Sequence, residues 1–185
     1  MKRLSTFLAR ISNGWVALTA LIIFGLFIAL VLPRQSAQAQ AGAARVESPD
    51  MSFLYSADDL YRMADAYGEA GRADYIRVRF TFDLIWPLVY VFFLGTGISW
   101  VNRKAFPPDS RWRLTNLAPL VSGLFDYLEN LCASLVMLRY PAHTALADTL
   151  APIFTLAKWV ILSGSFALLL VGIVLALLRS RSIAR

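Results

Sequence analysis

Three polar side chains that can exchange protons or accept hydrogen bonds lie close together in an apolar stretch of this chain. Residues 122–135, SGLFDYLENLCASL, carry Asp126, Glu129 and Asn130 among leucines and small residues. A charged side chain near the centre of a bilayer costs about 2.5–3.5 kcal/mol on insertion scales. Residues kept at such a cost are candidates for ligand binding, proton transfer or polar contacts between helices.

The spacing of these residues predicts that they share one face of a helix. Successive helical residues are about 100° apart, so Asp126, Glu129 and Asn130 fall on one stripe with small residues such as Gly123 and Ser134. Leucines occupy the opposite side. In a membrane the leucine side faces lipid, and the small and polar side faces other helices.

Lys158 is the expected partner of this stripe. It lies in the apolar run APIFTLAKWVILSGSF, at a depth similar to that of Glu129 in its own segment. Because the two charges are opposite, we predict that Glu129 and Lys158 pair directly or through one water. Asp126 and Asn130 complete the predicted network.

A second apolar segment adds acidic and aromatic groups to the same predicted site. Asp83, Trp86 and Tyr90 lie along one stripe of FTFDLIWPLVYVFF. With Asp83 included, the carboxylates outnumber the single lysine, unless Arg77 or Arg79 turns inward.

Two interpretations of the polar set stay open. In the first, the chain is a non-enzymatic membrane protein whose buried polar groups support the bundle or bind a small ligand or lipid. In the second, it is a membrane-embedded enzyme that acts on an apolar or lipid substrate, with Asp126 or Glu129 as acid or base. The predicted ligand-binding residues are Asp83, Trp86, Tyr90, Asp126, Glu129, Asn130 and Lys158.

The elements that must position these residues are apolar segments long enough to cross a hydrocarbon core, which takes about 20 helical residues. The first resembles a signal peptide with a cleavage site near Ala37–Ala39, but its apolar run is long for one, so we expect a retained helix. We predict an all-α fold, a four-helix transmembrane bundle in a single domain over residues 1–185. The predicted spans are residues 14–33, 79–101, 115–138 and 151–178.

Composition supports a membrane protein and argues against other classes. The 185 residues are 58% hydrophobic and only 16% charged, which is unusual for a soluble domain. The single cysteine and the single histidine leave no material for an internal disulfide or a His-based metal site, and we expect no metal and no cofactor. Although the net charge is +6, the basic residues lie near the ends of the apolar segments, so we expect no nucleic-acid partner.

The distribution of basic residues predicts the orientation. Lys and Arg number three in the N-terminal tail, four in residues 102–114 and three in the C-terminal tail. Residues 139–150 carry one, and residues 34–79 carry six together with seven acidic residues. By the positive-inside rule, both termini are cytoplasmic in a multi-pass protein of the plasma (inner) membrane.

The long outer loop, residues 34–78, is predicted to have two parts. Residues 34–50 are rich in Ala, Gln, Ser and Gly, and are typical of a flexible linker. Residues 56–67 predict a short amphipathic helix, with Ser56 and Asp59 spaced as a capping box. Gly68 and Gly71 are expected to end it.

The runs YGEAGRADYIRVRFTFDLIWPLVY and FDYLEN resemble a pattern found in uncharacterised four-helix bacterial membrane proteins. This resemblance covers most of the chain and implies no activity. The expected architecture is also similar to that of emopamil-binding, sterol-isomerase-like membrane bundles, which hold acidic, amide and aromatic groups inside. The expected partners are the lipid bilayer and a lipid or small apolar ligand, with membership of a larger membrane complex as an open alternative.

Overall fold

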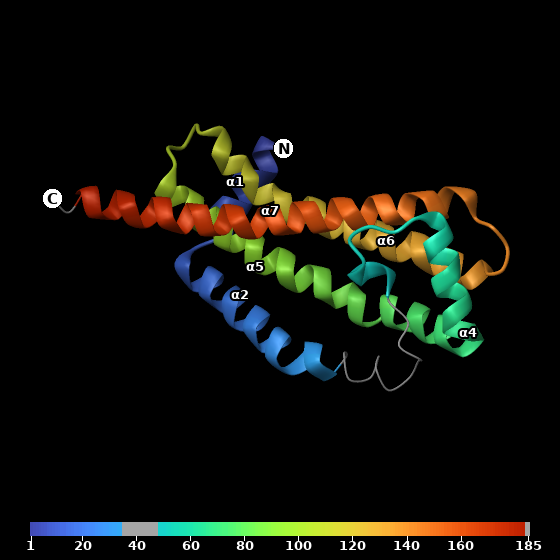
Figure 1. The fold of residues 1–185 in the computed structure, drawn as a ribbon. Coiled ribbons are helices and arrows are strands. Elements are labelled where there is room, and N and C mark those ends of the chain that lie inside the picture. Colours follow the sequence, from blue (N-terminus) through green and yellow to red (C-terminus); the bar gives the residue numbers. More distant parts are fainter. Residues whose placement is uncertain (35–47, 184–185) are drawn as a thin grey trace. The chain divides into compact units, whose positions relative to one another are not determined.

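The computed structural model describes residues 1–34 and 48–183, and within these ranges the chain is helical and contains no strand. Residues 35–47, which hold most of the predicted linker and the signal-peptide-like site, lie outside the described residues, as do residues 184–185. The elements, labelled in Figure 1, are α1 (Lys2–Ile11), α2 (Gly14–Leu26), η1 (Phe27–Val31), η2 (Pro49–Met51), α4 (Ala57–Arg79), α5 (Phe82–Ala105), η3 (Arg111–Leu117), α6 (Ala118–Arg139) and α7 (Ala145–Ile183).

Four helical segments of the described chain are long and apolar enough to cross a membrane. Each contains the whole of one predicted span, which confirms that the apolar pattern marks helices of membrane-spanning length. The chain is therefore compatible with an integral membrane protein. The four segments are Gly14–Arg34, Ala57–Ala105, Arg111–Arg139 and Ala145–Ser180.

Packing divides the described chain into two compact units. The first unit comprises residues 1–27, 89–122 and 160–183, and in it Gly172 of α7 closely approaches Val101 of α5. A Cβ added at Gly172 would lie 2.8 Å from Val101 Cγ1, so only glycine permits this approach. Stacked rings of Phe24 and Phe93, with centroids 4.5 Å apart, fill another part of this core.

The second unit comprises residues 28–88 and 123–159. Its hydrophobic core forms where α4 crosses the ends of α6 and α7, as Figure 1 shows. Leu60 and Ala64 of α4 are fully buried there against Val136 of α6 and Ala151 of α7. The unit also holds most of the residues that the sequence assigned to a polar site.

Helix α4 begins as predicted and breaks at Gly68 as predicted, but a second helical segment follows the break. The Ser56 hydroxyl accepts from the Asp59 amide, and the Asp59 carboxylate accepts from the Ser56 amide, which completes the predicted capping box. Gly68 has φ +62° and ψ 179°, a non-helical conformation open essentially to glycine alone, so the first helical segment ends there at a kink, which confirms the break predicted at this residue. Helical structure then continues to Arg79, which brings that arginine to the start of α5.

Candidate functional site

The polar stripe of α6 is buried in the second unit. Glu129 is fully buried, and Asp126 and Asn130 are each 5% exposed. Their common face follows from the helical spacing of residues 126, 129 and 130. Asn130 Nδ2 donates a hydrogen bond to Asp126 Oδ1 at 3.3 Å. The predicted link between the amide and the aspartate is therefore present.

Lys158 of α7 supplies the positive charge that the sequence predicted for this stripe. Its ammonium forms an ion pair with Glu129 Oε2 and lies 3.8 Å from Asp126 Oδ1. Lys158 is only 4% exposed, so its side chain does not reach out to the surface of the unit. The predicted pairing of Glu129 with Lys158 is confirmed, and Asp126 is a second carboxylate near the same ammonium.

Arg79, at the end of α4, is a second buried cation. Its guanidinium donates from Nη1 and Nη2 to the two carboxylate oxygens of Asp50, each at 2.9 Å, which is the bidentate geometry that arginine favours. Nη1 also donates to the Asp83 carboxylate, one helical turn along the chain. The sequence left open whether Arg77 or Arg79 turns inward; Arg79 does, while Arg77 is exposed and pairs with Asp74.

Asp50 enters the site from the segment that precedes α4. Ser48 precedes the short helix η2, and its hydroxyl hydrogen bonds to Asp50. Burial disfavours the Asp50 carboxylate, but the positive charges of Arg79 and Lys158 outweigh burial and lower the pKa of Asp50 to about 2. Asp50 is therefore ionised at neutral pH and links the loop segment to Arg79.

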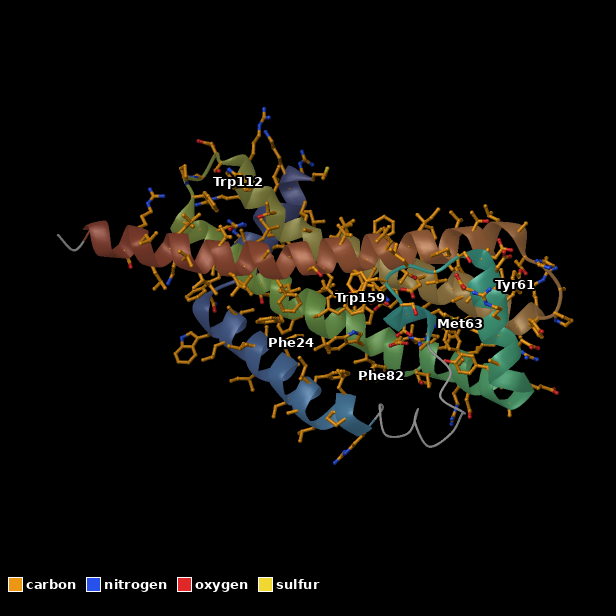
Figure 2. All side chains as sticks on the ribbon, in the orientation of Figure 1. Phe24, Tyr61, Met63, Phe82, Trp112 and Trp159 are labelled. Atoms are coloured by element: carbon orange, nitrogen blue, oxygen red, sulfur yellow. The ribbon has the colours of Figure 1, made fainter. Side chains whose placement is uncertain are left out.

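Residues 48–55, which we call the loop strap, also hold to α7 through uncharged contacts. The indole Nε1 of Trp159 donates to the Asp50 carbonyl at 2.9 Å, and its ring stacks on Phe53 with centroids 5.4 Å apart. The Tyr55 hydroxyl hydrogen bonds to Thr155 Oγ1 at 3.0 Å. Figure 2 labels Trp159, whose side chain reaches η2.

The buried charges of this unit do not balance. Two cations, Lys158 and Arg79, form ion pairs with four carboxylates, those of Asp50, Asp83, Asp126 and Glu129. We call these six residues the buried charge cluster. If every group is ionised, the cluster carries more negative than positive charge. Its carboxylate oxygens can then accept further hydrogen bonds or a proton.

Three oxygen atoms on α6 have no hydrogen-bond partner among the described residues. They are Glu129 Oε1, Asn130 Oδ1 and Ser134 Oγ. Their residues are at most 5% exposed and share one face of α6. A buried acceptor without a partner costs about 1–3 kcal/mol, so these atoms favour a hydrogen-bond donor at this face.

Trp86 and Tyr90 have different places from the other predicted site residues. Trp86 belongs to the unit that holds the buried charge cluster and is half-buried there. Tyr90 is fully buried in the first unit, so its role beside the cluster stays a prediction.

Sequence reasoning missed three contributors, Ser48, Asp50 and Trp159. Ser48 and Asp50 flank Pro49, a turn signal that could have marked an ordered segment inside the predicted linker. Trp159 directly follows Lys158 but carried no separate signal.

The residues that the structure describes contain no group of three or more His, Cys, Asp or Glu side chains arranged to hold a metal ion. The buried charge cluster offers ion pairs and acceptor oxygens without a hydrogen-bond partner among the described residues. It can hold a donor group such as a hydroxyl or ammonium, or it can hold an added proton. Comparison of the chain with protein-family models, with curated proteins and with solved structures found no significant match.

Proposed function

We propose that this chain is a multi-pass protein of the plasma (inner) membrane, built as a four-helix transmembrane bundle in a single domain with both termini cytoplasmic. Four apolar helices of sufficient length support the membrane assignment. The excess of Lys and Arg in the N-terminal tail, residues 102–114 and the C-terminal tail supports the orientation.

Within this protein, the face of α6 that carries Glu129, Asn130 and Ser134 binds a small molecule or lipid head group that donates hydrogen bonds. The observation that carries this proposal is the set of three unpartnered oxygens on one buried face. A purely structural network would place a protein donor on each such acceptor, because a buried polar network stabilises best when fully satisfied. A hydroxyl or ammonium group of a ligand satisfies them instead.

The ion pairs of Lys158 and Arg79 prepare this face for binding. The pairs of Arg79 connect the loop strap, α4 and α5, and the pairs of Lys158 connect α6 and α7, all within the second unit. Groups held in place by such contacts lose little conformational freedom when a ligand binds, which favours affinity. In this account, the same cluster stabilises the unit and orients the acceptors.

Ser134→Ala tests the binding proposal because the Ser134 hydroxyl has no partner among the described residues. Removing it should leave the melting temperature of the purified protein unchanged or slightly higher. It should also reduce the fraction of protein that retains a small molecule from the host membrane, measured by native mass spectrometry. Ser165→Ala is the matched control, since that hydroxyl donates to Ile161 O within its own helix.

The control should retain the molecule at the wild-type level. The proposal fails if wild-type protein carries no non-covalent molecule, or if Ser134→Ala retains it as well as wild type does.

The second candidate is a membrane-embedded enzyme, and the environment of Glu129 favours it. Its carboxylate is fully buried, with Oε2 on Lys158 and Oε1 free to exchange a proton with a bound group. The two candidates differ in what happens to the molecule. An enzyme predicts that wild type and Glu129→Gln carry chemically different molecules, while a binding protein predicts the same molecule at different occupancy.

A further inference from the structure

Helix α1 packs on the rest of the first unit through one narrow, polar face. Ser5 is 4% exposed; its hydroxyl donates to Arg113 O at 3.1 Å, and its carbonyl accepts from Asn116 Nδ2 at 3.0 Å. Arg103 Nη1 donates to the Ala9 carbonyl at 2.8 Å on the same side. These contacts set the rotation of α1 about its axis and decide which side chains point outward.

The first outward stripe is apolar. Leu4, Phe7 and Ile11 follow the helical repeat of three and four residues, and they are 47%, 57% and 45% exposed. In water this stripe would leave apolar surface uncovered. A helix with an exposed apolar stripe beside a charged one is typical of helices that lie in a membrane interface.

The second outward stripe is basic. Lys2, Arg3 and Arg10 are exposed, and the helix contains no acidic residue. Together with Thr6 and Phe7 they line a shallow groove of about 500 Å³. Three cations beside one polar and one aromatic side chain complement an anionic group attached to an apolar body.

The position of α1 in the chain places these stripes at a membrane surface. Only Ser12 and Asn13 separate α1 from α2, which begins the first candidate membrane span at Gly14. Helix α1 therefore lies where a span enters the bilayer. Trp112 of η3, labelled in Figure 2, is 58% exposed in the same unit, and tryptophan is enriched at membrane interfaces.

We propose that α1 lies in the membrane interface and binds anionic phospholipid head groups in its basic groove. Lys2, Arg3 and Arg10 hold the phosphate, and Phe7 rests beside the glycerol and upper acyl chain. The apolar stripe and its direct continuation into a span select a lipid rather than a nucleic acid or an acidic protein. This inference depends on α2 crossing the membrane and is independent of the ligand proposed for α6.

The test uses the full chain in nanodiscs of phosphatidylcholine alone or of phosphatidylcholine with one third phosphatidylglycerol. Each basic side chain near an anionic surface strengthens binding about fivefold. Amide hydrogen exchange in residues 1–13 should therefore slow about fivefold or more when phosphatidylglycerol is present, and high salt should reduce this effect. The triple variant Lys2→Gln, Arg3→Gln and Arg10→Gln should exchange equally in both lipids.

A charge-matched control removes three exposed arginines of the second unit, as Arg62→Gln, Arg77→Gln and Arg139→Gln. It should keep the full response of residues 1–13 to phosphatidylglycerol. The proposal is overturned if wild-type protein exchanges equally in both lipids. It is also overturned if the control variant loses the response, because net charge rather than α1 would then be responsible.

Discussion

The ammonium of Lys158 is close to two carboxylates of α6, those of Glu129 and Asp126. Removing one partner of a buried pair costs about 3–5 kcal/mol in soluble proteins. Polar contacts between membrane helices average nearer 0.6 kcal/mol, because the unfolded chain in the membrane also finds partners. The cost of losing Lys158 should therefore lie between these limits, and most of it should come from leaving Glu129 buried without a cation.

Lys158→Met should lower the melting temperature of the purified protein, because it leaves the fully buried Glu129 carboxylate unpaired. Adding Glu129→Gln should recover much of that loss, since a neutral amide needs no cation. Thermal unfolding in one detergent, followed for both variants and wild type, measures the difference. Equal melting temperatures for the single and double variants would show that Glu129 and Lys158 are not energetically coupled.

At the residue scale, the sequence was sufficient to predict the pair of Glu129 and Lys158 but not the contact of Asp50 with Arg79. The pairing of Glu129 with Lys158 was predictable because charged side chains inside apolar helices are rare, and burying them without an opposite charge is costly. Asp50 lies in a polar stretch, where an aspartate is ordinary and carries no sign of burial. Only the folded position of Arg79 gives it a role.

Asp50 predicts a pH dependence of stability. Its pKa falls from 3.8 to about 2 on folding, so the folded state favours the carboxylate. The resulting contribution, about 2 kcal/mol, is complete above pH 4 and is lost as the pH falls toward 2.

Asp50→Asn removes this titration, so the free energy of unfolding of the variant should depend less on pH between 4 and 2 than that of wild type. Denaturant unfolding across this range provides the measurement. Parallel curves for the two proteins would contradict the assigned role of Asp50.

At the element scale, α4 shows where local signals stop being sufficient. The capping box at Ser56 and Asp59 correctly predicted its start. Gly68 correctly predicted a break, since its φ and ψ are not helical, but a second helical segment runs through Gly71 to Arg79. The contacts of Tyr75 in the core and of Arg79 with Asp50 and Asp83 stabilise this second segment. Tertiary contacts here override the low helix propensity of Gly71.

Gly68→Ala should destabilise the protein by about 1–3 kcal/mol, because alanine rarely adopts φ +62° with an extended ψ. No atom lies within 4 Å of the added Cβ, so the cost belongs to the backbone alone. Gly164→Ala in α7 is the matched control, because its added Cβ also meets open space and its φ is not positive.

Thermal unfolding should show a clear loss for Gly68→Ala and no loss for Gly164→Ala. Equal stability of the two variants would mean that the bend in α4 straightens at no cost.

At the scale of the whole molecule, the spans were predictable because length and apolar content alone decide whether a helix crosses a bilayer. The side-by-side arrangement of helices was not predictable in the same way, since it depends on contacts between residues distant in sequence. The extended reach of α4 and the docking of the loop strap on α7 are of this kind.

Orientation in the membrane is a separate prediction for the whole chain. A reporter fused after Arg185 should be cytoplasmic, and one inserted near Gln40 should be on the opposite side, because ten of the basic residues lie in the two tails and residues 102–114. Reporter activity in intact cells provides the measurement. The opposite pair of results would reverse the orientation and place the buried charge cluster toward the cytoplasm.

The central claim is that the buried charge cluster binds a ligand as well as stabilising the protein. The most direct measurement is native mass spectrometry of the double variant Lys158→Met and Glu129→Gln beside its melting temperature. Our account predicts a stable protein that carries the small molecule at clearly lower occupancy than wild type, because the variant replaces a charged carboxylate, whose Oε1 is a proposed acceptor, by a neutral amide that accepts more weakly. A stable double variant that keeps the molecule at wild-type occupancy would contradict the account and leave the cluster a structural role alone.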